Sequence, residues 1–364
     1  MIDPDYAVRV ARARAELERQ GADVLLVSLG SDLPYLTGYR AMPLERLTMA
    51  VVPRDGTAVL VVPELEAPRV VPRPGVFEIR PWGETEDPVA IVAGLAGTSE
   101  RALVGDQTWA VFLLELQKAL PATDFVSARS VSRSLRVVKD DAEITLLREV
   151  AEVADTVAGL LVGHTFAGKT EAQVSHEVGE MLVANGNDTA EFAIVASGPN
   201  GASPHHEAGG RTIGPGDPIV VDFGGKRHGY TSDTTRMYHV DEPSARYLEI
   251  HGIVLAAQQA AVAAVRPGVS AEAVDAAARN VIESAGYGEF FIHRTGHGIG
   301  LDTHEDPYIV TGNTGLLRSG MAFSIEPGIY LPGEFGVRIE DIVVCTPDGA
   351  HRLNNSSRAV AVVE

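Results

Sequence analysis

Cysteine is almost absent from the 364-residue sequence, which contains only Cys345. A single thiol allows neither an intramolecular disulfide framework nor a metal site built from several thiolates. Any bound metal therefore has to be held by oxygen and imidazole groups. A reducing compartment fits this composition, and a cytoplasmic location is expected.

Positive charge and long apolar runs are also in short supply. The 30 Lys and Arg residues are outnumbered by 49 Asp and Glu, and the net charge of -19 opposes binding to nucleic acid. The longest apolar candidate, residues 253–265, is interrupted by Gln258 and Gln259, so we expect no membrane span. Residues 1–20 carry charges throughout, which predicts an amphipathic helix and not a signal peptide.

Apolar strands and helical stripes alternate in the first third of the chain. Strands are predicted at 22–29, 49–52, 59–62 and 103–105, with a helix near 111–119. The basic, Ser-rich stretch 127–139 marks the predicted domain boundary. The sequence therefore predicts a small α/β domain over residues 1–133 and a second domain over 139–364.

Helix start signals organise the second domain. Asp140 and Glu143 form a capping-box pattern before a long amphipathic helix, and further helices are predicted after Thr170, Ser244 and Ser270. Strands are predicted at 219–223, 237–240, 321–325 and 337–344. We expect a curved, mainly antiparallel sheet backed by helices, and hence an α/β (α+β) chain.

Two aspartates stand on neighbouring strands around a tight turn. If the turn centres on Arg227 and His228, Asp222 lies opposite Asp233, and like charges in that position repel unless a cation sits between them. A hairpin shifted by one or more residues would instead leave two unrelated aspartates.

A second cluster contains three histidines within residues 291–307. His293, His297 and His304 are predicted to lie in a loop broken by glycines. One histidine alone is usually an ordinary surface or core residue, but three in one loop favour ligation or proton transfer.

Two glutamates complete the candidate site. Glu326 ends an apolar strand just before Pro327, and Glu340 is predicted to share a strand face with Arg338. Arg338 and Glu340 could also form a structural ion pair, but a carboxylate in an apolar strand has to be paired or metal-bound. Four carboxylates and one imidazole form a hard donor set for Mn, with Co, Zn or Fe as alternatives. Two divalent ions are predicted because the carboxylates would otherwise repel one another.

These motifs, taken in order, resemble the pita-bread metallopeptidases. The resemblance rests on the spacing of Asp222 and Asp233, on GHGIG around His297, on SIEPG around Glu326 and on RIED around Glu340. Residues 28–40, SLGSDLPYLTGYR, resemble the amino-terminal domain of prolidases and aminopeptidases P. The resemblance implies a creatinase/prolidase-type first domain and a pita-bread catalytic domain.

The family resemblance also implies roles for individual residues. Asp222 would bind one ion, His297 and Glu326 the other, and Asp233 and Glu340 would bridge the pair. A metal-activated hydroxide would attack the scissile carbonyl, with Glu326 as general base and His304 as donor to the developing oxyanion. On the substrate side the resemblance indicates His205, the first of the His205–His206 doublet, and His293.

Arg338 indicates the proline-directed branch of the family. Its guanidinium suits the free carboxylate of a proline-containing dipeptide, so the expected activity is that of an Xaa-Pro dipeptidase (prolidase), with Xaa-Pro aminopeptidase as the alternative. The resemblance further implies a homodimer. A metal-free binding module of the same fold is the alternative from another class, and the complete ligand set argues against it.

Overall fold

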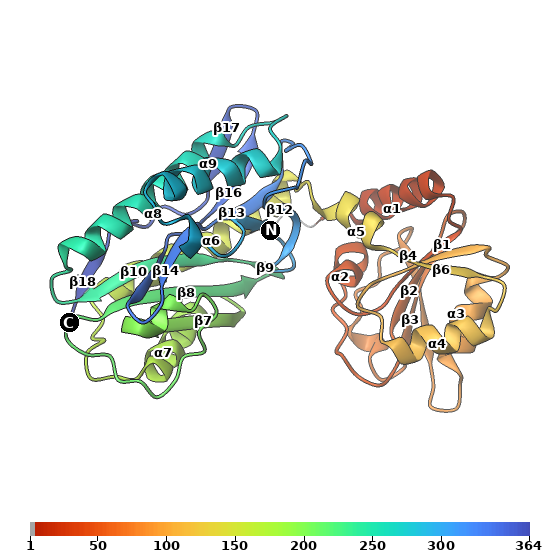
Figure 1. Ribbon diagram of the computed structural model, residues 1–364. Coiled ribbons are helices and arrows are strands. Elements are labelled where there is room, and N and C mark those ends of the chain that lie inside the picture. The colour runs from red at the N-terminus through yellow and green to blue at the C-terminus, as the bar shows by residue number, and fades with distance from the viewer. Residues whose placement is uncertain (1–3) are drawn as a thin grey trace. The chain divides into compact units, whose positions relative to one another are not determined.

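The computed structural model describes residues 4–364, and the chain forms two compact units, Met1–Arg136 and Val137–Glu364. The first unit contains one sheet and the second unit contains several (Figure 1), and each unit has its own hydrophobic core. The division falls inside the basic stretch 127–139, although residues 129–136 of that stretch form helix α5 of the first unit. None of the helices in the described part of the chain is both long and apolar enough to span a membrane.

The first unit is a six-stranded sheet with the order β4-β3-β2-β1-β5-β6. Its strands are β1 (Val24–Val27), β2 (Met49–Pro53), β3 (Ala58–Pro63), β4 (Phe77–Trp82), β5 (Arg101–Val104) and β6 (Asp124–Ser127). Its helices are α1 (Tyr6–Gln20), α2 (Asp32–Thr37), η1 (Ala67–Arg69), α3 (Pro88–Ala96), α4 (Ala110–Ala119) and α5 (Arg129–Arg136). The amphipathic helix predicted for 1–20 is confirmed from Tyr6, while residues 1–3 lie outside the described part.

Both faces of this sheet are covered. Helix α1 contacts α2 and α5, helix α3 contacts α4, and Figure 1 shows the two groups on either side of the strands. All four residues of β1 are buried, because successive side chains of a strand point to opposite faces and both faces carry helices. That explains the uninterrupted apolar run in the sequence.

The second unit contains two five-stranded sheets and a separate hairpin. The expected mainly antiparallel pairing is confirmed, with β10 and β18 as the parallel pair, but the expectation of a single sheet is wrong. The first sheet has the order β18-β10-β8-β7, with β9 paired to β8, and the second has the order β12-β11-β13-β16-β17. The strands of the first sheet are β7 (Thr189–Ser197), β8 (Pro218–Arg227), β9 (Tyr230–Thr231), β10 (Thr234–Val240) and β18 (Ala361–Val363). The others are β11 (Gly296–Gly298), β12 (Glu305–Ile309), β13 (Ala322–Ile325), β16 (Asp341–Thr346), β17 (Gly349–Arg352) and the hairpin of β14 (Gly328–Leu331) and β15 (Phe335–Arg338).

Helices cover each of these sheets. Helix α6 (Asp141–Val162) contacts β8 and α7 (Glu171–Ala184) contacts β7, whereas α8 (Ala245–Ala264) and α9 (Ala271–Ser284) contact each other and strands of the second sheet. The capping box predicted at Asp140 is present, and the helix predicted after Thr170 also begins with a capping box, formed by Thr170 and Gln173. Short 3-10 helices, η2 (Gly198–Ala202) and η3 (Gly288–Phe290), complete the unit.

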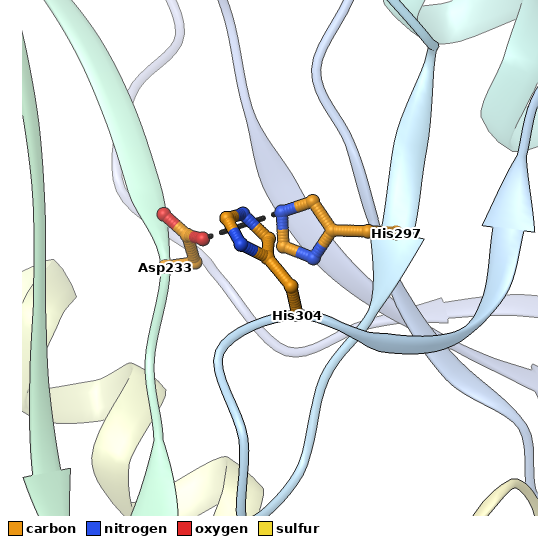
Figure 2. Close-up of side chains that lie close together, drawn as sticks. All are labelled: Asp233, His297 and His304. Carbon is orange, nitrogen blue, oxygen red and sulfur yellow. Dashed lines mark ion pairs between the residues drawn. The ribbon is translucent and has the colours of Figure 1, made fainter. Parts of the chain in front are cut away.

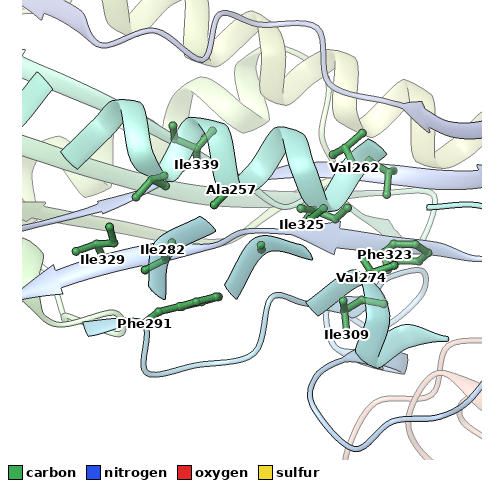
Figure 3. Close-up of a cluster of buried hydrophobic side chains, with 14 of the residues drawn as sticks. Ala257, Val262, Val274, Ile282, Phe291, Ile309, Phe323, Ile325, Ile329 and Ile339 are labelled. Atoms are coloured by element: carbon green, nitrogen blue, oxygen red, sulfur yellow. The ribbon is translucent and has the colours of Figure 1, made fainter. Parts of the chain in front are cut away.

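The larger core of the second unit lies between α8, α9 and the second sheet. Figure 3 shows Ala257 of α8 and Ile282 of α9 among side chains of the strands, including Phe323 and Ile325 of β13. Because β13 ends directly at Glu326, this packing also fixes the position of a predicted metal ligand.

Candidate metal centre and substrate pocket

Asp222 lies within β8 and Asp233 directly precedes β10. The turn between these strands is formed by His228 and Gly229, whose φ angles of 51° and 89° match a two-residue type I′ turn. The predicted turn at Arg227 and His228 is therefore wrong, and Thr235, not Asp233, is opposite Asp222. A shift of two residues preserves the face of the sheet, so Asp233 remains a diagonal neighbour of Asp222.

His297 lies on the short strand β11, so its predicted location in a loop is wrong. The flanking glycines serve close strand packing, because a Cβ at Gly296 would lie 1.9 Å from the Ser324 carbonyl oxygen. The Nδ1 atom of His297 is 3.1 Å from the carbonyl oxygen of Gly298. A hydrogen bond from Nδ1–H to this carbonyl leaves the Nε2 lone pair for a metal.

Glu326 follows β13 and points its carboxylate at the His297 ring. Its Oε1 is 3.3 Å from His297 Nε2 and accepts a hydrogen bond from the Ser324 hydroxyl at 3.0 Å. Burial opposes the ionisation of Glu326, but the interactions of its carboxylate with the His297 ring, and with His293 and Arg338, outweigh burial and lower its pKa to about 2. Glu326 is thus an anion at neutral pH.

Glu340 sits in a break between two strands. The continuous strand predicted for 337–344 is wrong, because β15 pairs with β14 whereas β16 pairs with β13. The strand pairing changes at Ile339 and Glu340, which lie between β15 and β16. The Glu340 carboxylate is directed at the site from this break. Glu340 Oε2 accepts a hydrogen bond of 2.8 Å from the Thr235 hydroxyl.

The predicted metal ligands come together as two neighbouring groups of donor atoms. Asp222, Asp233 and Glu340 offer atoms within 4.8 Å of one another, as do His297, Glu326 and Glu340. Burial and mutual repulsion raise the pKa values of Asp222, Asp233 and Glu340.

Two oxygen atoms of the cluster also lack protein partners. Asp222 Oδ1 and Glu340 Oε1 are buried without a hydrogen bond among the described residues, which is costly unless a cation binds them. The donor set therefore fits divalent cations.

His304 stands beside this cluster on the loop between β11 and β12. Its ring lies against that of His297, with a centroid separation of 4.1 Å and nearly perpendicular planes. Figure 2 shows Asp233 close to both rings. Burial, together with the electrostatic interactions with His297 and Arg294, lowers the pKa of His304 to about 4. The ring is therefore neutral near pH 7 and can donate one hydrogen bond.

The histidine doublet divides between two environments. His205 lines the cavity beside the carboxylates, whereas His206 Nε2 lies 2.8 Å from the buried carboxylate of Glu171. Glu171 also accepts hydrogen bonds from the backbone and hydroxyl of Ser197. The choice of His205 as the residue on the substrate side is consistent with this placement.

His293 and Arg338 are linked through Tyr330. His293 Nε2 lies 2.8 Å from the Tyr330 hydroxyl, and Arg338 Nη1 donates to the same hydroxyl at 2.9 Å. Sequence reasoning missed Tyr330, because nothing in its local pattern distinguishes it from a core tyrosine. It also missed Thr235, although strand alternation from Asp233 would have placed Thr235 on the ligand face.

The predicted site residues surround one cavity of about 570 Å³, a volume that suits a small molecule or a short peptide. Its lining consists of Phe192, Ile194, Pro204, His205, Asp222, Asp233, His293, Arg294, His297, Thr303, His304, Glu326, Arg338 and Glu340. Every predicted site residue is thus among the lining residues.

The fold and the carboxylate-rich centre define a hydrolase of the metallopeptidase class. Residues 145–347 match the model of metallopeptidase family M24, and residues 9–138 match the creatinase/prolidase N-terminal domain. The chain belongs to family M24 and is a metallopeptidase, which confirms the resemblance seen in the sequence and implies divalent metal ions.

Relatives match over nearly the full chain. A probable dipeptidase PepE of Mycobacterium tuberculosis is 44% identical over 98% of this chain and 96% of its own length. A prolidase structure from Thermococcus sibiricus is 37% identical with a TM-score of 0.93 and full coverage of both chains. An Xaa-Pro dipeptidase structure from Bacillus anthracis is 29% identical with a TM-score of 0.91, covering 99% of this chain and 100% of that one.

Proposed function

We propose that this metallopeptidase hydrolyses the bond before proline in Xaa-Pro dipeptides. The observation that carries the proposal is the cluster of carboxylates and one imidazole that lines a cavity of about 570 Å³. The names of the relatives, dipeptidase and prolidase, support the same substrate class.

The five predicted ligands would hold two divalent ions in the two groups of donor atoms. Asp222 belongs to the first group, His297 and Glu326 belong to the second, and Glu340 is common to both. Asp233 Oδ2 lies 3.5 Å from His297 Nε2, which supports the bridging position proposed for Asp233 beside Glu340. When bound, the ions supply a nucleophile at neutral pH and stabilise negative charge on the scissile oxygen.

Protein side chains around the substrate would transfer a proton, stabilise the oxyanion and position the dipeptide. Glu326 is ionised and would accept the proton of the attacking water as general base. The neutral ring of His304 would donate a hydrogen bond to the oxyanion. His205 and His293, which also line the cavity, would position the dipeptide.

Several broader features are part of the same proposal. Manganese is the proposed ion because the ligands are mainly carboxylates, with Co, Zn or Fe as alternatives. A cytoplasmic location agrees with the single cysteine, which is buried and unpaired. The proposed homodimer rests on the family resemblance alone.

The experiment is hydrolysis of Leu-Pro beside a proline-containing tripeptide, with Mn²⁺ and with chelator as control. Metal-dependent cleavage of the dipeptide alone is the expected result. Removal of the first residue from the tripeptide would instead assign the chain to the Xaa-Pro aminopeptidases. Cleavage of neither substrate would contradict the proposal.

A further inference from the structure

Two arginines line the cavity, and they differ in what their guanidinium groups already bind. Arginine has five N–H donors, and Arg338 commits one from Nε, two from Nη1 and one from Nη2. The acceptors are the Thr235 hydroxyl at 3.1 Å, the Pro204 carbonyl at 3.3 Å, the Tyr330 hydroxyl at 2.9 Å and the Asp222 carboxylate at 2.7 Å. Bidentate binding of a carboxylate requires two parallel N–H groups, and Arg338 has only one left.

Arg294 is in the opposite situation. It lines the same cavity, yet its guanidinium has no hydrogen bond or ion pair to any acceptor within residues 4–364. It lies over the ring of Tyr308, with its central carbon 4.5 Å from the ring centroid. Stacking of this kind fixes the plane of the guanidinium while its edge N–H groups remain available.

The position of Tyr308 ties Arg294 to the candidate metal centre. Tyr308 lies on β12 directly opposite His297 of β11, so the stacked arginine is anchored beside a predicted metal ligand. The cavity wall also presents four carboxylates, of Asp222, Asp233, Glu326 and Glu340, whose charge the two proposed divalent ions would offset. An anionic substrate group is then attracted most directly by a cation whose donors are unused, and Arg294 is such a cation.

We propose that Arg294, in place of Arg338, binds the free carboxylate of the substrate and thereby favours dipeptides over longer peptides. The inference rests on the proposed function and adds to it the residue that determines specificity. A fixed guanidinium can bind a carboxylate through two parallel hydrogen bonds. In a longer peptide the proline carbonyl is an amide and provides no charge there.

The test compares Leu-Pro with Leu-Pro amide, using Mn²⁺-loaded full-length protein and the variants Arg294→Gln and Arg294→Lys. Arg294→Gln is expected to raise KM for Leu-Pro by about tenfold or more, with little change in kcat and none in amide hydrolysis. Arg294→Lys should recover part of the loss. Arg266→Gln changes an exposed arginine outside the cavity and should behave as wild type. Equal effects on both substrates, or no effect on Leu-Pro, would overturn the proposal.

A binding measurement separates this inference from the proposed function. Calorimetric titration with L-proline and with prolinamide is expected to show that Arg294→Gln weakens binding of proline only. Wild-type protein that binds proline but cleaves no Xaa-Pro substrate contradicts the proposed function and leaves the Arg294 assignment intact. A variant that binds proline as tightly as wild type contradicts the assignment, and wild-type protein that binds neither proline nor Leu-Pro contradicts both.

Discussion

Arg338 Nη2 lies 2.7 Å from Asp222 Oδ2, and both side chains are buried. The Nε of the same arginine donates to the Thr235 hydroxyl, which in turn donates to Glu340. Arg338 thus orients two predicted metal ligands at once, Asp222 directly and Glu340 through Thr235. Groups that orient metal ligands in this way often control metal affinity as strongly as substitutions at the ligands themselves.

Replacing Arg338 is therefore expected to weaken metal binding. Arg338→Lys keeps the positive charge but cannot reach all four acceptors, so metal affinity should fall about 10- to 100-fold. Activity on Leu-Pro and Leu-Pro amide should decline together. Calorimetric metal titration measures the first effect, and thermal unfolding checks that the variant folds. Unchanged metal affinity with a raised KM for Leu-Pro alone would contradict this role. That result would instead support Arg338 as the residue that binds the free carboxylate of the substrate.

Thr235 offers a test of the same network at a single hydroxyl. Thr235→Val retains the shape of the side chain but removes the donor to Glu340, and metal affinity is expected to fall about tenfold. Thr235→Ser retains the hydroxyl and should bind metal nearly as wild type does. Equal metal affinities for the two variants, measured by the same titration, would exclude a role for this hydrogen bond.

His304 is expected to act on the reaction and not on substrate binding. Removing one donor to a developing oxyanion typically lowers kcat by a factor of about 10²–10³, so His304→Ala should show this loss with little change in KM. Steady-state kinetics on Leu-Pro measure both constants. The matched control is His176→Ala, which removes an exposed histidine outside the cavity. A large rise in KM with unchanged kcat would contradict the assignment.

Glu171 is expected to stabilise the segment that carries His205. Burial disfavours its charge, but hydrogen bonds from Ser197, His206 and Asn200 outweigh burial and lower its pKa. A lowered folded-state pKa contributes stability above the unfolded pKa, near 4.5, and that contribution is lost as the pH falls through the folded value.

Glu171→Gln should accordingly reduce the free energy of unfolding by about 2 kcal/mol at pH 7. The gap to wild type should narrow as the pH falls below about 4.5, the ordinary pKa of a glutamate. Denaturant unfolding at several pH values measures this difference, with Glu180→Gln, an exposed change on the same helix, as control. A gap that stays constant with pH would mean that the Glu171 charge does not contribute to stability.

Local signals in the sequence predicted much of the fold. The capping boxes at Asp140 and Thr170 are determined by residues three positions apart, and each helix begins where its box predicts. The register of the hairpin that carries Asp222 depends on which residues of its turn adopt a positive φ. Because Gly229 takes the second turn position, Asp222 pairs with Thr235, two residues beyond the predicted partner Asp233. The break between β15 and β16 reflects pairing with distant strands, and local alternation cannot reveal it.

The candidate site was predictable where side-chain chemistry is demanding. A carboxylate in an apolar strand, such as that of Glu326, needs a cation or a hydrogen-bond donor when it is buried. Its position in the sequence therefore indicates a site. The roles of the two arginines were less accessible, because the acceptors of Arg338 include Asp222 and Tyr330, which lie 116 and 8 positions away in the sequence. Arg294 is distinguished only by the absence of such acceptors, and that property appears only in three dimensions.

The most direct test of the two-metal account titrates Mn²⁺ into chelator-stripped protein while ions bound per chain and Leu-Pro hydrolysis are both followed. We predict two ions per chain and full hydrolysis only when the second ion binds, since Glu340 is shared by the two groups of donor atoms. Full activity with a single ion, or activity that survives in chelator, would contradict the account.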